Sequence, residues 1–257
     1  SAWASGLAAP SRRATLLNFL GSHDGIGLNP VQDLLPESAV ARLVDAALAR
    51  GGRVSWRAGT SGTRAPYELN INYLDALVDG PGSAAAERGL DRFLCAHAVA
   101  LAIVGVPILY LHSLLGSRGN PRAVAVHGSA RAINRARLDL ADVEHALRRP
   151  GTRRARTLAA FRRLILGRRR SGAFDPYGHQ DVLDLGPACF ALRRRDRDGA
   201  AAAVCVHNVT GDTVTVDLPR VHADGSKRWL AVRGSRVAGG GRLTLAPHGH
   251  AWWLADA

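Results

Sequence analysis

Residues 15–27 read TLLNFLGSHDGIG, and this stretch decides the fold. The run over residues 14–20 is almost wholly apolar and has the length of a buried β-strand. It ends at His23-Asp24, and two glycines follow within three residues. A carboxylate placed after a buried strand, on a loop whose glycines let backbone approach a ligand, is typical of the catalytic rim of a (β/α)8 barrel.

A second strand ends in the same way further along the chain. We predict a helix over residues 91–104 and a strand over residues 106–111, which leads into His112 and Ser113. The order strand, helix, strand predicts a βαβ unit with parallel neighbouring strands. Both strand ends then place polar side chains at one rim of a barrel.

The remaining sequence predicts helices followed by a β-rich segment. Helices are expected at residues 36–50, 139–147 and 152–169, and a polar loop at residues 52–66. After residue 172 the pattern changes to short alternating strands, expected at 181–185, 189–193, 202–208, 213–218, 228–232, 243–246 and 251–254. The predicted fold class is therefore α/β and then all-β. Residues 1–172 are the last part of a (β/α)8 barrel, and residues 173–257 form an antiparallel C-terminal β domain.

Composition limits the classes of protein that remain. The formal net charge is +13, but Lys227 is the single lysine, and the many arginines accompany abundant Ala and Gly. We interpret this as coding bias and expect no nucleic-acid partner, although an arginine-rich nucleic-acid-binding protein stays open as an alternative. No apolar run is long enough to span a bilayer, so no membrane is expected. Three cysteines without metal-ligand spacing predict reduced thiols in a cytoplasmic protein, without a bound metal.

Four motifs together resemble one family. They are NFLGSHDGIG at residues 18–27, YELNIN at 67–72, LHSLLG at 111–116 and SARAINR at 129–135. These strings resemble the sucrose phosphorylase and glucosylglycerate phosphorylase branch of the α-amylase superfamily (glycoside hydrolase family 13). The resemblance implies the C-terminal half of such an enzyme: the last barrel strands and then an antiparallel domain.

The resemblance also implies roles for single residues. Asp24 matches the carboxylate that stabilises charge developing on the sugar ring, and His23 matches a histidine that hydrogen-bonds the same sugar. Arg131 matches an arginine that reaches the glucose, which makes it a candidate sugar or phosphate contact. Arg135 is interpreted as a structural ion-pair former.

Other matched positions concern the acceptor of the glucosyl group. Tyr67 and Glu68 match residues that line the acceptor side, whereas their composition alone also fits a helix start with Glu68 near the positive end of the dipole. His112 completes the predicted substrate-binding residues. The chain departs from the family pattern at Asn29 and at residues 119–120, which leaves the acceptor open.

The implied activity is that of a retaining glycoside phosphorylase that moves glucose between an α-glucoside and inorganic phosphate without metal or organic cofactor. An α-glucoside hydrolase or transglucosidase of the same superfamily is the alternative. Because the chain begins with serine and contains no methionine, we expect a truncated chain whose partner is the missing N-terminal half of the barrel. The isolated chain is expected to be inactive, because the nucleophile and the acid/base are not matched. A homodimer is left open.

Overall fold

The computed structural model describes residues 2–58, 64–218, 227–237 and 241–255. The chain divides into two compact units, and each is described by itself. The first unit contains Ser1–Asn18, Leu94–Ile108 and Ala159–Ala257, and the second contains Phe19–Phe93 and Leu109–Leu158. The boundary predicted after residue 172 stays a prediction.

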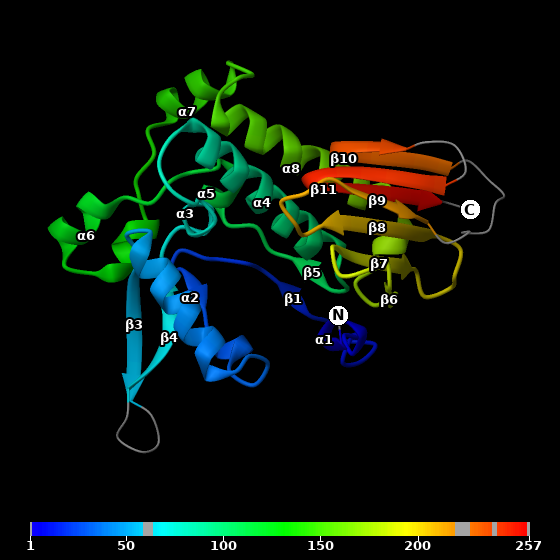
Figure 1. Cartoon of the computed structure of the whole chain (residues 1–257), viewed down its shortest axis with the longest axis horizontal. Coiled ribbons are helices and arrows are strands. Elements are labelled where there is room, and N and C mark those ends of the chain that lie inside the picture. Colours follow the sequence, from blue (N-terminus) through cyan, green and yellow to red (C-terminus); the bar gives the residue numbers. More distant parts are fainter. Residues whose placement is uncertain (1, 59–63, 219–226, 238–240, 256–257) are drawn as a thin grey trace. The chain divides into compact units, whose positions relative to one another are not determined.

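The first unit contains the antiparallel sheet that the sequence predicts. In the described residues its order is β10–β11–β8–β7–β6, and β9 pairs with the first residues of β11 (Figure 1). The strands are β6 (His179–Leu183), β7 (Cys189–Arg195), β8 (Ala202–Asn208), β9 (Val214–Asp217), β10 (Lys227–Val237) and β11 (Arg242–Ala255). The two strands predicted at 243–246 and 251–254 are thus one continuous strand.

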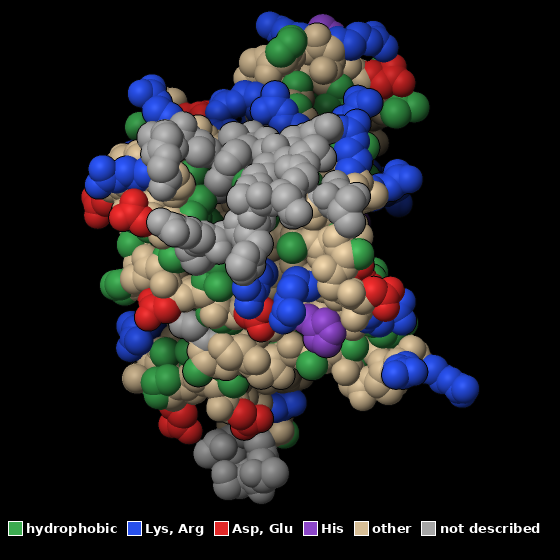
Figure 2. Space-filling view, turned by 90° about the vertical axis from the view of Figure 1, so that its right-hand side faces the viewer, with side chains coloured by type: hydrophobic (Ala, Val, Ile, Leu, Met, Phe, Trp, Pro, Cys, Tyr) green, Lys and Arg blue, Asp and Glu red, His purple; other side chains and the backbone are tan. Residues whose placement is uncertain are grey.

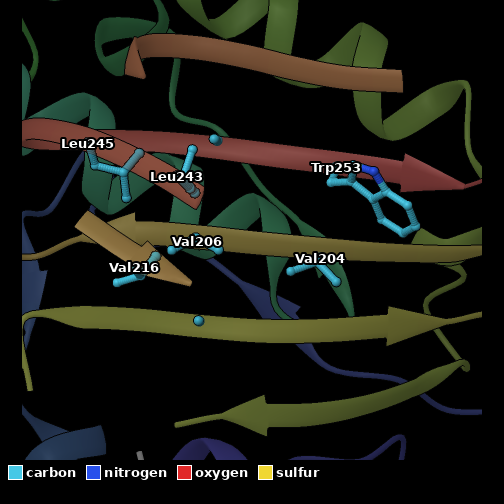
Figure 3. Packing of buried hydrophobic residues seen from close by; sticks show 8 residues of the cluster. Val204, Val206, Val216, Leu243, Leu245 and Trp253 are labelled. Carbon is cyan, nitrogen blue, oxygen red and sulfur yellow. The ribbon is translucent and has the colours of Figure 1, made fainter. Parts of the chain in front are cut away.

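The core of this sheet follows from alternation along its strands. Side chains of a strand point alternately to its two faces, so Val204 and Val206 of β8 share one face. They pack with Leu243, Leu245 and Trp253 of β11 in a single buried cluster (Figure 3). Burial of this apolar surface is the main stabilising contribution to the sheet.

The predicted parallel pair is present but short. Strand β1 (Leu17–Asn18) pairs in parallel with β5 (Val106–Pro107), which confirms the expected neighbours. The predicted strand lengths, residues 14–20 and 106–111, are wrong, and so is the expected burial, because Leu17 is 62% exposed. In the described residues β1 has a neighbour on one edge only, so further pairing and covering of its apolar face are missing.

The half-buried Arg168 and the buried Arg194 cap the end of α4 (Ser83–Ala102) within the first unit. Arg168 donates to the carbonyls of Leu101 and Gly105, and Arg194 donates to the carbonyl of Ala102 at 2.9 Å. The last carbonyls of a helix have no partner within the helix, and a cation also complements the negative end of its dipole. Burial lowers the pKa of Arg168 and of Arg194 to about 10.

The second unit contains a three-stranded sheet of order β2–β4–β3 in its described part. Strands β3 (Arg53–Ala58) and β4 (Arg64–Asn70) form a hairpin where a loop over 52–66 was predicted, so that prediction is wrong. β2 (Ile26–Gly27) follows directly on the His-Asp motif and pairs with β4. This pairing brings the His-Asp loop beside residues 67–70.

Short helices complete both units. They are α1 (Ala2–Ser5), η1 (Asn29–Val31), α2 (Glu37–Ala49), α3 (Tyr73–Ala76), α5 (Leu111–Leu114), α6 (Pro121–His127), η2 (Ala130–Asn134), α7 (Leu140–Leu147), α8 (Arg153–Arg169) and η3 (Gly172–Phe174). The predictions at 36–50, 139–147 and 152–169 match α2, α7 and α8. No helix among the described residues is long and apolar enough to cross a membrane.

Candidate active site

Asp24 lies on a tight loop whose shape depends on Gly25. Gly25 has a φ of 136°, and a Cβ there would lie 2.2 Å from the carbonyl oxygen of Leu69. Only glycine adopts this backbone conformation next to β4 without strain. The side-chain amide of Asn70 donates to the backbone carbonyl of Asp24 at 3.0 Å. Strand β4 therefore fixes the backbone that carries the Asp24 carboxylate.

The Asp24 carboxylate lies among three cationic or titratable side chains. Arg135 donates to its Oδ1 at 2.5 Å, and Nε of Arg131 lies 3.5 Å from the same oxygen. Nε2 of His23 is also 3.5 Å from this atom. Arg135 additionally donates to the backbone carbonyl of His23 at 3.3 Å. The predicted ion-pairing of Arg135 is thus present, and its partner is the candidate catalytic carboxylate itself.

Glu68 holds the guanidinium of Arg131 with both oxygens. Nε and Nη2 of Arg131 donate to Oε1 and Oε2 of Glu68 at 3.1 and 3.0 Å. This bidentate geometry fixes the plane of the guanidinium as well as its position. The hydrogen bond to Glu68 is also the main cause that raises the pKa of Arg131. Asn70 donates to the same Glu68 carboxylate, so both of its oxygens are engaged.

The alternation of β4 explains why Glu68 faces the site. Leu69 packs into a buried cluster with Leu28 and Ile71, and its strand neighbours point to the opposite face. Nη2 of Arg131 also donates a hydrogen bond to the hydroxyl oxygen of Tyr67 at 3.5 Å. Tyr67 and Glu68 therefore stand on a strand, and the alternative of a helix start is wrong.

His112 lies on α5 rather than directly after the strand predicted over residues 106–111. Its ring centroid is 5.2 Å from that of Tyr110, which in turn lies 6.5 Å from the ring of His23. The Tyr110 hydroxyl donates to the carbonyl of Asn134 at 2.7 Å. Burial lowers the pKa of His112, which favours its neutral form. Tyr110 therefore connects the two predicted histidines.

The structure thus gathers the six predicted residues in one unit, together with Asn70, Tyr110 and the ion-pairing Arg135. Arg131 directly contacts Asp24, Glu68 and Tyr67, while His112 is reached through ring contacts. Asn70, Tyr110 and the Asp24 contact of Arg135 were missed. Asn70 stood inside a matched motif, which was a signal; no local pattern distinguishes Tyr110.

The described residues contain no group of three His, Cys, Asp or Glu side chains placed to hold a metal ion.

Residues 119–120, where the sequence departs from the family pattern, make local contacts that explain the residues present. The Gly119 amide donates to Asp75 at 2.6 Å, and the Asn120 side chain accepts from the Ala123 amide at the start of α6. Asn120 therefore acts as a helix N-cap.

Known proteins resemble this chain in sequence over most of its length. No family model matches the chain. It is 37% identical over 221 residues to a glucosylglycerate phosphorylase of Escherichia coli, covering 86% of this chain and 39% of that protein. It is 38% identical over 214 residues to a glucosylglycerate phosphorylase of Spirochaeta thermophila, covering 81% and 35%. The chain is homologous to the glucosylglycerate and sucrose phosphorylases of the α-amylase superfamily.

Solved structures share the fold of this chain. The crystal structure of a sucrose 6F-phosphate phosphorylase from Thermoanaerobacter thermosaccharolyticum matches with a TM-score of 0.60 at 22% identity, covering 76% of this chain and 37% of that one. A pullulanase from Paenibacillus barengoltzii matches with a TM-score of 0.53 at 16% identity, over 73% of this chain and 29% of that one. The predicted fold class is confirmed. The chain spans 35–39% of the length of the glucosylglycerate phosphorylases it matches.

Proposed function

We propose that this chain is part of a retaining glycoside phosphorylase that transfers glucose between a glucosylglycerate-type α-glucoside and inorganic phosphate. The observation that carries the proposal is the contact of Asp24 with Arg131, which Glu68 holds in a bidentate pair. The identity of 37–38% to glucosylglycerate phosphorylases supports this substrate class over a sucrose-type one.

In this proposal Asp24 stabilises the positive charge that develops on the sugar ring, because an oxocarbenium-like transition state gains from a nearby carboxylate. His23 hydrogen-bonds the same sugar. His112, whose neutral form burial favours, contacts the sugar through its imidazole. Arg131 contacts a sugar hydroxyl or the phosphate, since a planar guanidinium suits bidentate recognition of phosphate. Tyr67 and Glu68 border the acceptor.

We infer that Asp24 cannot complete the reaction with the carboxylates of this chain. Retaining chemistry needs a nucleophile and an acid/base about 5–5.5 Å apart. Glu68 contacts Arg131 and Asn70 with its two oxygens and is only 7% exposed, so it is not free to attack or to donate a proton. Two further carboxyl groups must come from another polypeptide segment.

We propose that this segment is the earlier half of the barrel and that it covers the face of β1 and β5. Leu17, Val106 and Ile108 of the first unit are 62%, 38% and 46% exposed. A parallel sheet is normally buried on both faces, so these side chains need a covering layer.

Size-exclusion chromatography tests this proposal. We expect the 257-residue chain to associate or aggregate; a monomer with a cooperative melt would contradict the proposal. A homodimer would appear as a defined species of twice the mass.

The test of function uses a chimera in which residues 14–255 replace the matching segment of the E. coli glucosylglycerate phosphorylase. We expect release of glucose 1-phosphate from glucosylglycerate and phosphate by the chimera, and none by the 257-residue chain. Asp24→Asn should abolish turnover without unfolding, whereas Asp45→Asn on the far side of the local core, in α2, should not. Turnover that yields glucose rather than glucose 1-phosphate would favour the hydrolase alternative.

A further inference from the structure

The first unit contains a cavity that the proposed reaction does not use. It measures about 970 Å³ and is lined by residues 5–12 near the start of the chain and by residues 177–181 and 195–198 around strands β6 and β7. Small-molecule sites commonly occupy about 300–1,000 Å³. The cavity is therefore large enough for a sugar-sized ligand and larger than a bare inorganic anion requires.

The cavity is lined by three arginines, Arg12, Arg195 and Arg197, and by two carboxylates, those of Asp181 and Asp198, so the lining carries one cation in excess. The Asp181 carboxylate is shared, because Arg193 approaches it at 2.9 Å and Arg195 at 3.2 Å. Nε of Arg195 is buried and has no hydrogen-bond partner among the described residues. Arg12, another arginine of the lining, is exposed and forms no ion pair within the part of the chain that the structure describes.

Arg197 also lines the cavity, and its side chain is oriented by two contacts. Its Nε donates to Asp175 at 2.7 Å, and its guanidinium carbon lies 5.5 Å from the centre of the Tyr177 ring. Two contacts on one side orient the guanidinium while 58% of the side chain remains exposed. A pre-oriented arginine loses less conformational entropy when it binds an anion.

We propose that this cavity binds a phosphate monoester with a polyhydroxylated body, such as a sugar monophosphate. Guanidinium groups match the geometry of phosphate oxygens, and three of them line this cavity. The carboxylate of Asp198 also lines the cavity and can accept hydrogen bonds from sugar hydroxyl groups. The imidazole of His179 lines it too and can accept or donate such hydrogen bonds. The cavity volume beyond the anion accommodates the sugar ring.

The experiment is a residue-resolved NMR titration of the chimera described above, which supplies the covering barrel half and is here extended to carry residues 2–255 of this chain. The three probes are glucose 6-phosphate, inorganic phosphate and glucose. Glucose 6-phosphate should shift the amide signals of residues 6–9 and 177–181 saturably. Inorganic phosphate should shift the same signals at higher concentration, and glucose alone should not shift them. The shifts should weaken with added NaCl because the binding groups are solvent-accessible charges.

Three variants separate this site from the candidate active site. The double variant Arg12→Gln, Arg197→Gln should weaken binding of glucose 6-phosphate by about tenfold or more, since it removes two phosphate contacts. Arg162→Gln, an exposed arginine of α8 that does not line the cavity, and Arg131→Gln in the candidate active site should leave these shifts unchanged. Shifts confined to residues near Asp24, or shifts that persist in a folded double variant, would overturn the proposal. If the double variant fails to fold, loss of the same shifts in Arg12→Gln alone is required.

Discussion

Acidification should destabilise the β sheet of the first unit through His207. This side chain is fully buried; its Nδ1 donates to the carbonyl of Phe190 at 2.9 Å, and its Nε2 accepts from Nε1 of Trp252 at 3.3 Å. A proton on Nε2 would break the bond from Trp252. Burial accordingly lowers the pKa of His207 to about 4. The folded state therefore holds this imidazole neutral.

The sign and size of the effect follow from proton linkage. Below pH about 6.5 the unfolded chain binds a proton at this histidine and the folded chain does not. The free energy of unfolding therefore decreases as the pH is lowered from about 6.5 to about 4. Between pH 7 and pH 5 the loss is about 2 kcal/mol for His207. His250, whose pKa burial lowers to about 3 beside His207 and Arg233, adds a similar loss.

Urea unfolding of the chimera at a series of pH values measures this dependence. The variant His207→Gln should lose about 2 kcal/mol of the difference between pH 7 and pH 5, whereas His145→Gln, an exposed residue of α7, should keep the full difference. The ¹⁵N shifts of the His207 ring should show a neutral Nδ1–H tautomer at pH 5.5. An unchanged pH slope in a folded His207→Gln, or a charged ring at pH 5.5, would refute the reasoning.

Three further predictions concern single features. Arg194→Met removes a buried donor to three backbone carbonyls and should lower the free energy of unfolding by about 3–5 kcal/mol in urea titrations; a loss below about 1 kcal/mol would contradict its capping role. Gly25→Ala should abolish turnover of the chimera, because its Cβ would collide with the Leu69 carbonyl; full activity would show that the loop adapts. Duplex DNA should not bind the chain at physiological salt; binding with a steep salt slope would promote the nucleic-acid alternative.

The surface arrangement of charge supports that last expectation. In the described residues several arginines pair with carboxylates: Arg50 and Arg92 with Asp79, and Arg156 with Glu87. On the face shown in Figure 2, Lys and Arg side chains form separate groups, several of them beside Asp or Glu. Such pairs reduce the positive field that would attract a phosphate backbone.

Much of the secondary structure was predictable because its signals are local. The apolar periodicity and the turn residues located α2, α7 and α8 and most strands of the antiparallel sheet. The hairpin of β3 and β4 was missed because β3 is largely exposed and owes its conformation to pairing with a later strand. The lengths of β1 and β5 were overestimated because strand length depends on neighbouring strands, which a local pattern does not contain.

The sequence by itself determined the superfamily, the order of the strand-loop motifs and the residue types of the candidate site. These depend on short strings such as His23-Asp24-Gly25, in which neighbouring residues act together. The tertiary structure decided the pairings within the site. Glu68 holds Arg131, and Arg135 contacts Asp24, across 63 and 111 residues of chain. Such contacts arise from strand register and loop closure, because these bring distant segments within a few ångströms, and no local pattern records which distant partner a charged side chain will meet.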